Sequence, residues 1–303
     1  MITVVFGELA ALGAAVSWAV APILYRYALV KLNPISANIV RCASNAVILF
    51  LILLLFGKAE NIASLPIASL FLIIASGVIG LGVGDTLYMV GLNAVGIARA
   101  VPLASTYPLF SLIWATLLLG EIVTVPGILG AVVILLGIWL LSKEKETVPV
   151  EVTGKHVRLG VIASLTTALA WSISITLMNF AVSMAHVNSL DANYAVVTTR
   201  IAVVAVFLLV FSPVLDKKRT FLKVNRGTII TLCAGGLVAN GIGWLLMNYG
   251  LLNALEAQVV PISSTTPLFS ALAGFLLFHE KLTASKTLGS ILVVVGISLI
   301  FMF

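Results

Sequence analysis

Charged residues are scarce in this sequence. Only 9% of its 303 residues are Asp, Glu, Lys or Arg, while 61% are hydrophobic and the mean hydropathy is +1.20. A soluble domain carries about 25% charged residues, so this composition excludes an ordinary soluble protein. Apolar runs of about 20 residues recur along the chain, and each is long enough to cross a bilayer as a helix. We therefore expect an all-α polytopic protein of the cell membrane, in contact with the lipid bilayer.

Cysteines, histidines and phosphate-binding motifs are also few or missing. Cys42 and Cys233 lie within apolar runs, which suits inert packing residues and offers no disulfide or metal framework. His156, His186 and His279 lie far apart, and the sequence has no ATP-binding motif and no paired catalytic carboxylates. We thus expect no metal, no cofactor and no enzymatic activity, and ATP-driven transport by this chain alone is disfavoured. The net charge of +6 lies mostly in loops, where it fits anionic headgroups rather than nucleic acid.

Polar breaks between the apolar runs predict ten membrane spans. The one long mixed-charge linker, residues 143–157, divides five spans from five. We therefore expect a first five-helix repeat at 1–142 and a second at 158–303. The predicted spans are 8–29, 35–56, 67–91, 95–119, 124–142, 158–183, 190–212, 227–251, 255–279 and 284–302.

The second half repeats the first at a fixed offset. The segment 102–121 returns at 261–280, 159 residues later, and apolar composition alone would not keep its polar and proline positions in register. An odd number of spans per unit would insert the second copy upside down, which is a recurrent architecture of secondary transporters. The recurring residues include two prolines and a glutamate, namely Pro102, Pro108 and Glu121 against Pro261, Pro267 and Glu280.

One extended motif occurs in both halves. It reads P-x-x-S-x-x-P-L-F, then an apolar run, G-E or H-E, a Thr and G-x6-G. This pattern resembles the EamA-type ten-helix members of the drug/metabolite transporter superfamily, and the likeness covers nearly the whole chain. The resemblance implies two inverted five-helix bundles enclosing a central cavity, and export or exchange of small metabolites.

The membrane orientation stays open between two interpretations. With Arg41 and Arg200 set aside as residues inside spans, fourteen of the remaining fifteen basic residues lie on the side opposite the N-terminus, and Lys58 is the exception. The rule that basic loops stay in the cytoplasm then places both termini outside. The family resemblance implies cytoplasmic termini.

Asp85 is the most informative single residue of the sequence. It lies inside the third predicted span, where a lone charge is costly and marks a transport pathway, a proton relay or an ion pair. The repeat places Trp244 at the equivalent position. Proton coupling, binding of a substrate amine, and a structural ion pair with Arg41 or Arg200 all remain open for this carboxylate.

Arg41 and Arg200 lie in the second spans of the two halves. A guanidinium inside a bundle suits a carboxylate or phosphate, so either arginine is a candidate ligand for an anionic substrate. Structural pairing, or extension of the side chain to the headgroups, explains them equally well.

Polar and aromatic side chains inside the spans are candidates to line a cavity. Amides at helical spacing should face protein or water rather than lipid, since lipid would leave them unsatisfied. Interhelical hydrogen bonding or simple packing is the alternative for each. The candidate cavity residues are Trp18, Tyr25, Tyr107, Trp171, Asn179, Asn240, Trp244 and Asn248.

The recurring prolines predict paired hinges rather than a binding site. Each proline frees a carbonyl one turn earlier, which neighbouring hydroxyls such as those of Ser105, Thr106 and Ser264 could satisfy. Glu121 and Glu280 end the same spans at helix C-termini, where the helix dipole does not favour a carboxylate, so each should have another partner. We interpret both as structural or gating residues.

These observations favour a secondary transporter with alternating access, as a monomer or homodimer. Its substrate would be a small metabolite such as an amino acid or related compound, exported or exchanged, with proton coupling as an open mechanism. The alternatives are a membrane-embedded enzyme and a non-transporting receptor or assembly subunit.

Overall fold

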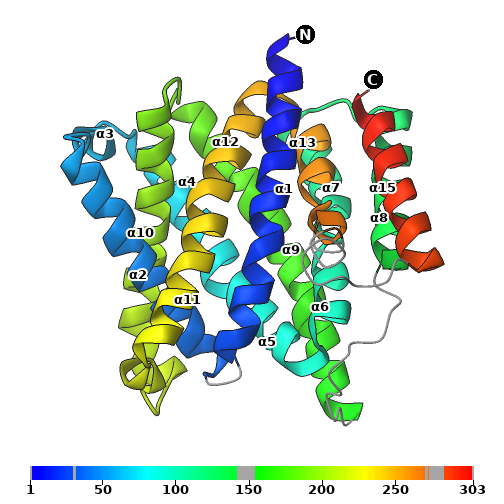
Figure 1. Ribbon diagram of the computed structural model, residues 1–303. Helices are drawn as coiled ribbons and strands as arrows, with labels where there is room; N and C mark the ends of the chain where they lie inside the picture. Colours follow the sequence, from blue (N-terminus) through cyan, green and yellow to red (C-terminus); the bar gives the residue numbers. More distant parts are fainter. Residues whose placement is uncertain (1, 30–31, 142–153, 270–271, 273–282, 302–303) are drawn as a thin grey trace.

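The computed structural model describes residues 2–29, 32–141, 154–269, 272 and 283–301, and within them it is entirely helical, without strands (Figure 1). The helices of the first half are α1 (Ile2–Leu29), α2 (Pro34–Leu55), α3 (Glu60–Ala63), α4 (Ile67–Ser76), the π-helix η1 (Gly77–Gly84), α5 (Asp85–Val95), α6 (Ile97–Ala104), α7 (Tyr107–Leu119) and α8 (Val125–Leu141). Those of the second half are α9 (Gly154–Met184), α10 (Leu190–Leu215), the 3-10 helix η2 (Thr220–Lys223), α11 (Arg226–Gly236), the π-helix η3 (Leu237–Gly243), α12 (Trp244–Asn253), α13 (Glu256–Ser263) and α15 (Ala284–Phe301).

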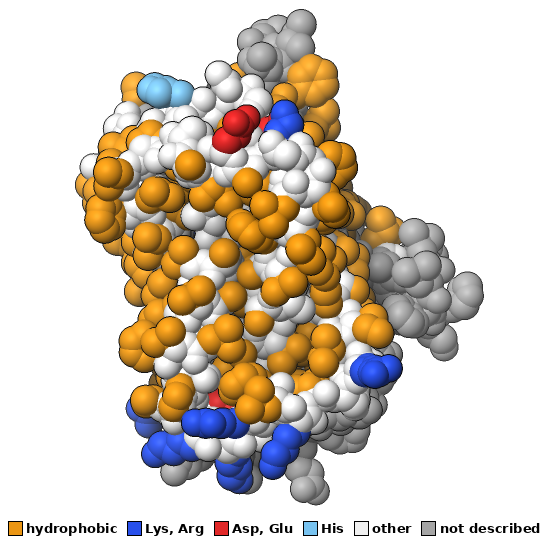
Figure 2. All heavy atoms as spheres, turned by 90° about the vertical axis from the view of Figure 1, so that its left-hand side faces the viewer, with side chains coloured by type: hydrophobic (Ala, Val, Ile, Leu, Met, Phe, Trp, Pro, Cys, Tyr) orange, Lys and Arg blue, Asp and Glu red, His pale blue; other side chains and the backbone are white. Residues whose placement is uncertain are grey.

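Most of the predicted spans are present as apolar helices. Seven described segments are long and apolar enough to cross a membrane, and two shorter apolar helices, Val125–Leu140 and Thr287–Ile300, match the fifth and tenth predicted spans. The predicted span 255–279 begins as α13, and much of its remainder lies outside the described residues, as does Glu280. Hydrophobic side chains cover the middle of the outer surface in Figure 2, as a lipid-facing wall requires.

The two ends of the bundle differ in charge. Both chain termini lie at one end, at the top of Figure 1, which we call the terminal end. Lys and Arg side chains gather at the opposite end in Figure 2, which we call the basic end. The α10–α11 connection at the basic end contains Lys217, Lys218, Arg219 and Lys223.

Local sequence signals explain where several helices begin. Asn33 caps α2 by accepting a hydrogen bond from the Ser36 N–H at 2.8 Å, and Pro34 occupies the first turn. Ser189 and Asn225 cap α10 and α11 in the same way. Ser36 also donates through its hydroxyl to Asp216 at the end of α10. Burial would raise the pKa of the Asp216 carboxyl, but hydrogen bonds from Ser36 and from the Phe221 and Thr220 region hold that pKa below its usual value.

A π-helix interrupts the third span of each half at the same place. η1 begins at Gly77 and η3 begins at Leu237. The repeat offset of 159 relates Gly77 to Gly236, so the two π-helices begin within one residue of equivalent positions. The wider π-helical turn re-aims the side chains that follow it, and such segments are frequent at functional sites. The apolar runs predict continuous spans here, and the glycine-rich composition is the only sign of the interruption in the sequence.

The fourth span is broken in the middle of the bundle, and α13 ends in a matching break. α6 ends before Ser105 and α7 begins at Tyr107, while α13 ends at Ser263 before the turn at Ser264 and Thr265. Hydroxyls bond to backbone carbonyls in both breaks, but of the carbonyls one turn before a proline only that of Ser263 accepts such a bond among the described residues, from Thr266 at 3.3 Å. The other hydroxyl bonds run from Thr106 to Leu103, Ser263 to Val260, Ser264 to Pro261 and Thr265 to Ile262, at 2.7 to 2.9 Å. The two breaks meet where the Tyr107 and Ser263 hydroxyls lie 2.9 Å apart.

The first helix of each half packs against the third span of the other half. α1 lies against α11, η3 and α12, and α9 lies against α4, η1 and α5. A Cβ added at Gly243 would meet the Trp18 indole, and one added at the equivalent Gly84 would meet the Trp171 indole. The same exchange links Gly236 to Arg41 and Gly77 to Arg200, so reciprocal contacts recur at the offset of 159. The two halves are therefore interlocked.

α8 and α15 form a tight pair at the edge of the bundle (Figure 1). A Cβ at Gly137 would lie 2.7 Å from the Gly289 carbonyl oxygen and 2.9 Å from the Val293 nitrogen, both of which are backbone atoms. Close approach of this kind depends on the missing side chain.

Gly137→Ala is therefore expected to destabilise the protein by about 1–3 kcal/mol through overpacking. Gly127→Ala on the same helix is the control, because its new Cβ would meet only the Thr124 hydroxyl at 3.2 Å. The control should be neutral or gain up to about 1 kcal/mol from helix propensity. Thermal melting of the two variants in the same detergent tests the prediction, and equal melting temperatures would contradict it.

Candidate functional site

A cavity lies between the two halves, at and below the level of the helix breaks. Its empty space amounts to about 740 Å³, part of which is open to solvent. Its lining residues on α1 all fall between Trp18 and Tyr25, in the part of that helix nearer the basic end (Figure 1). The other lining residues are Arg41, Leu81, Asp85, Tyr88, Val101, Ser105, Tyr107, Trp171, Ile175, Ala239, Asn240, Trp244 and Thr266.

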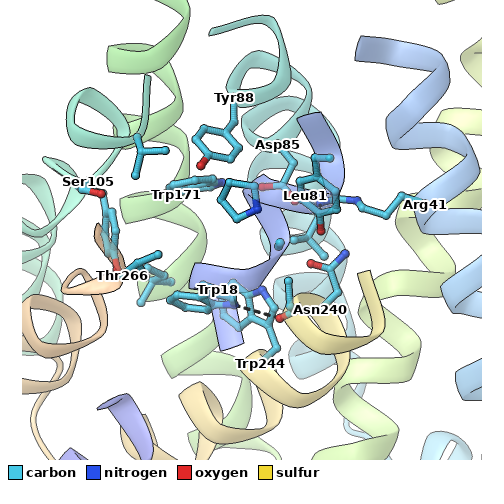
Figure 3. A pocket seen from close by; sticks show the side chains of 17 residues that line it. Trp18, Arg41, Leu81, Asp85, Tyr88, Ser105, Trp171, Asn240, Trp244 and Thr266 are labelled. Atoms are coloured by element: carbon cyan, nitrogen blue, oxygen red, sulfur yellow. Dashed lines mark hydrogen bonds and ion pairs between the residues drawn. The ribbon is translucent and has the colours of Figure 1, made fainter. Parts of the chain in front are cut away.

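A buried ion pair forms one wall of the cavity (Figure 3). The Arg41 Nη2 donates to Asp85 Oδ2 at 2.6 Å, and the Trp171 Nε1 donates to Asp85 Oδ1 at 2.7 Å. Arg41 is 2% exposed and Asp85 7% exposed. Of the interpretations left open for Asp85, the structure therefore shows the ion pair with Arg41. Both carboxylate oxygens accept a hydrogen bond from a side chain of the cavity wall.

Aromatic rings form most of the remaining wall. The Trp18 and Trp244 ring centroids lie 5.8 Å apart, and Trp171 packs against Tyr88 at 5.0 Å and Tyr107 at 6.0 Å. These are favourable tilted or edge-on arrangements. The Trp18 Nε1 donates to the Ala239 carbonyl at 2.9 Å, so the indole is held in place.

Arg200 lies behind this wall rather than in it. Its guanidinium carbon sits 3.6 Å from the centroid of the Trp244 ring, and its Nη2 donates to the Ser174 hydroxyl at 2.6 Å. No carboxylate pairs with it among the described residues, and Arg200 does not line the cavity. The two repeat-related arginines thus have different roles in charge balance: Arg41 is neutralised and Arg200 is not.

The cavity brings together most of the predicted lining residues and excludes two. Trp18, Tyr25, Tyr107, Trp171, Asn240 and Trp244 line it together with Asp85. Asn248 lies one turn beyond Trp244 and donates to the Asn193 side chain at 2.9 Å, and Asn179 donates to Glu256 at 3.1 Å. These two amides are thus placed in interhelical hydrogen bonds.

The paired prolines lie at the breaks, near the cavity but outside its lining. Pro102 is inside α6, Pro108 is in the first turn of α7, Pro261 is inside α13, and Pro267 follows the lining residue Thr266. This placement is consistent with their interpretation as hinge positions.

Glu121 has the separate partner that its position at a helix C-terminus requires. Its two carboxylate oxygens accept hydrogen bonds from the Glu256 and Ala257 backbone N–H groups, each at 2.9 Å. A carboxylate at the N-terminus of α13 is also favoured by the helix dipole. Glu121 thus ties the end of the first half's broken span to the start of the second half's α13.

Glu256 is a buried carboxylate that the sequence analysis did not single out. It is fully buried and accepts hydrogen bonds from Thr176 Oγ1 at 2.5 Å and Asn179 Nδ2 at 3.1 Å. No Lys, Arg or His pairs with it among the described residues. Glu256 is the first residue of α13 and lies at the start of the predicted span 255–279. A carboxylate at the end of a span is expected to reach water, so the sequence offers no sign that this one is buried.

Tyr88 lines the cavity but was not among the residues predicted to do so. It follows Asp85 by three residues on α5, so helical spacing places it on the same face, and this spacing was the available signal.

Comparison with known proteins gives three findings. The EamA-like transporter family model matches residues 5–143 and again residues 158–302. An uncharacterized transporter of Archaeoglobus fulgidus is 22% identical over 298 residues, covering 97% of each chain. A solved crystal structure superposes with a TM-score of 0.76 at 16% identity, covering 98% of this chain and 96% of the other, which supports the fold alone.

Proposed function

This chain belongs to the EamA-like transporter family, within the drug/metabolite transporter superfamily, and is a multi-pass membrane transporter of small molecules; we propose that it is a secondary transporter working by alternating access. Its site would be the cavity between the halves. The observation that carries this proposal is the meeting of two broken helices, one from each half, beside that cavity. Such breaks are a recurrent feature of transporter sites.

We further propose ten spans arranged as two inverted five-helix repeats, residues 1–142 and 158–303, joined by the linker 143–157. The reciprocal contacts of Trp18 with Gly243 and of Trp171 with Gly84 support this arrangement. α1 runs from the terminal end toward the basic end, whereas α9 begins at the basic end, which also favours inversion (Figure 1).

The cycle would alternate between opening at the two ends. In this conformation the cavity lies toward the basic end, and the terminal end is held closed by the contact of Glu121 with α13. Opening at the terminal end would separate α7 from α13 and break that contact, with the proline-containing breaks as hinges.

Proton coupling, if it drives the cycle, would use Glu256 rather than Asp85. Asp85 has a cationic partner, while Glu256 has only neutral donors and the nearby Glu121 carboxylate. A buried carboxylate without a counter-ion takes up a proton more readily than one in an ion pair. The repeat offset of 159 relates Glu256 to Ile97, so the first half has no carboxylate at the equivalent position.

The proposed cargo is a small amphipathic metabolite such as an amino acid or related compound, exported or exchanged across the cell membrane. The test is flux of a broad metabolite panel in proteoliposomes, in both directions, with and without a pH gradient. Saturable flux of at least one compound is expected. Binding without flux of any compound would instead favour a receptor or assembly subunit, and conversion of a compound would favour an enzyme.

A further inference from the structure

Two residues of the cavity lining each hold a buried donor that no group in the described part of the chain satisfies. Arg41 Nε and Asn240 Nδ2 are buried without a partner among the described residues, and both residues line the cavity. Asp85 offers acceptors, but each of its oxygens already accepts a short hydrogen bond. Unpaired buried donors cost free energy, which a ligand acceptor would recover.

Other unpaired buried groups of the described chain do not alter this balance at the cavity. The unpaired acceptors and hydroxyls lie on residues that do not line it, namely Asn45, Ser111, Thr198 and Asn248. Figure 3 shows the Asn240 amide directed toward the side of the pocket that Arg41 and Asp85 form. In this view the Asn240 amide and the Arg41 side chain lie on the same side of the pocket.

The charges around the cavity favour an anion. Arg41 and Asp85 neutralise each other, and Arg200 adds one positive charge behind the Trp244 ring. Arg200 Nε and Nη1 also have no hydrogen-bond partner in the described part of the chain. An uncompensated buried charge is costly, so an anionic ligand nearby would stabilise the bundle as well as bind to it.

The rest of the lining suits an apolar body. Trp18, Tyr88, Tyr107, Trp171 and Trp244 surround the cavity, with Leu81 and Ile175 between them. These surfaces bury carbon atoms and stack on planar groups, whereas they offer little to a fully hydrated anion.

From these observations we infer that the cavity takes a small carboxylate with an apolar body, its carboxylate accepting hydrogen bonds from Arg41 Nε and Asn240 Nδ2. This inference rests on the proposed transport function and names its class of cargo. An amine is less favoured than a carboxylate, because Arg41 already neutralises Asp85 and Arg200 adds a second guanidinium nearby. The two free donors match the two oxygens of one carboxylate.

A series of ligands with one common body tests the inference without any mutation. The probes are 3-phenylpropanoate, 3-phenylpropanamide and 3-phenylpropylamine, titrated against the detergent-purified protein at pH 7. Quenching of tryptophan fluorescence reports binding, because Trp18, Trp171 and Trp244 line the cavity. We expect the carboxylate to bind at least about tenfold more tightly than the amide, as charge-assisted hydrogen bonds do. Equal or tighter binding of the amide or the amine would overturn the inference.

Asn240→Asp is the sharpest variant, since it keeps the shape of the side chain and replaces the donor by a negative charge. The preference for carboxylate over amide should fall at least about tenfold. Asn253→Asp, at the end of α12 and away from the cavity lining, is the matched control and should keep the wild-type preference. Asn240→Leu, which removes the donor without adding a charge, should also lose the preference. Retention of the wild-type preference in either Asn240 variant would refute the assigned contact.

Flux measurements with the same probes separate this inference from the transport proposal. Selective binding of the carboxylate without flux would leave the ligand class standing and count against transport. Flux of neutral or amine compounds, with no carboxylate preference, would leave transport standing and overturn the ligand class.

Discussion

Asp85→Asn is expected to destabilise the protein by about 3–5 kcal/mol, because it leaves the Arg41 guanidinium buried without a counter-ion. The pair is direct, with Nη2 and Oδ2 2.6 Å apart, and the side chains are 2% and 10% exposed. Asparagine has nearly the same shape and can still accept a hydrogen bond, so the loss of stability measures the effect of removing the charge. Thermal melting and denaturant titration in one detergent measure the effect.

A second ion pair of the same chain provides the control. Lys58 and Asp191 also lie in contact, at 2.8 Å, but their side chains are 44% and 46% exposed. Asp191→Asn should therefore leave the melting temperature close to that of the wild type, because solvent screens an exposed pair. The double variant Arg41→Gln with Asp85→Asn should be less destabilised than the sum of the single variants, since neither charge is then left alone. If Asp85→Asn melts like Asp191→Asn, the buried pair is not the stabilising element described here.

Glu256→Gln is expected to abolish the effect of a pH gradient on transport. One coupled proton can accumulate substrate up to about tenfold per pH unit. The glutamine keeps the size of the side chain and can still accept from Thr176 or Asn179, but it cannot carry a proton. Exchange at equal pH on both sides should continue, because the proposed hinges and cavity are unchanged. Accumulation in proteoliposomes with an imposed pH gradient measures the difference.

Glu8 is the matched control for this experiment. It is another buried carboxylate, 2% exposed, on α1, which packs against α13. The titratable group that contacts Glu256 directly is Glu121, which accepts a hydrogen bond from the Glu256 N–H. Glu8 lies near the same end of α13, because its neighbour Gly7 on α1 packs against Ala254. Glu8→Gln should keep the wild-type gradient effect. A Glu256→Gln protein that still accumulates substrate in proportion to the gradient would rule out its coupling role.

The helical architecture was predictable because bilayer physics leaves few choices. Apolar runs had to be spans, and the 159-residue offset had to produce equivalent elements, so α2 and α10 or α5 and α12 fall where expected. The π-helices were not predictable, because an extra residue in a helical turn leaves no periodic signal in a uniformly apolar segment. The break at Ser105 and Thr106 was foreseen only as a kink, since proline position does not distinguish a bend from an interruption.

The sequence indicates which residues could line the cavity better than it indicates which of them form pairs. Aromatic and amide residues within spans had to face protein, and Trp18, Trp171 and Asn240 line the cavity. Which arginine pairs with Asp85 depends on the packing of α2 against α5, and sequence spacing does not contain that information. Glu256 escaped notice because a carboxylate near a span end is usually solvated, and its burial depends on α9 of the same half and on Glu121 of the other.

The exchange of first helices between the halves constrains how the chain is made. Trp18 and its hydrogen-bond partner Ala239 are 221 residues apart, so α1 leaves the ribosome long before its packing surface on η3 exists. During synthesis the apolar faces of α1 must be held by lipid or by the insertion machinery until the second half arrives. Neither half can bury its own first helix, and two separately expressed halves would have to find each other to do so. The segment synthesised first, α1, is therefore among the last to form its native contacts.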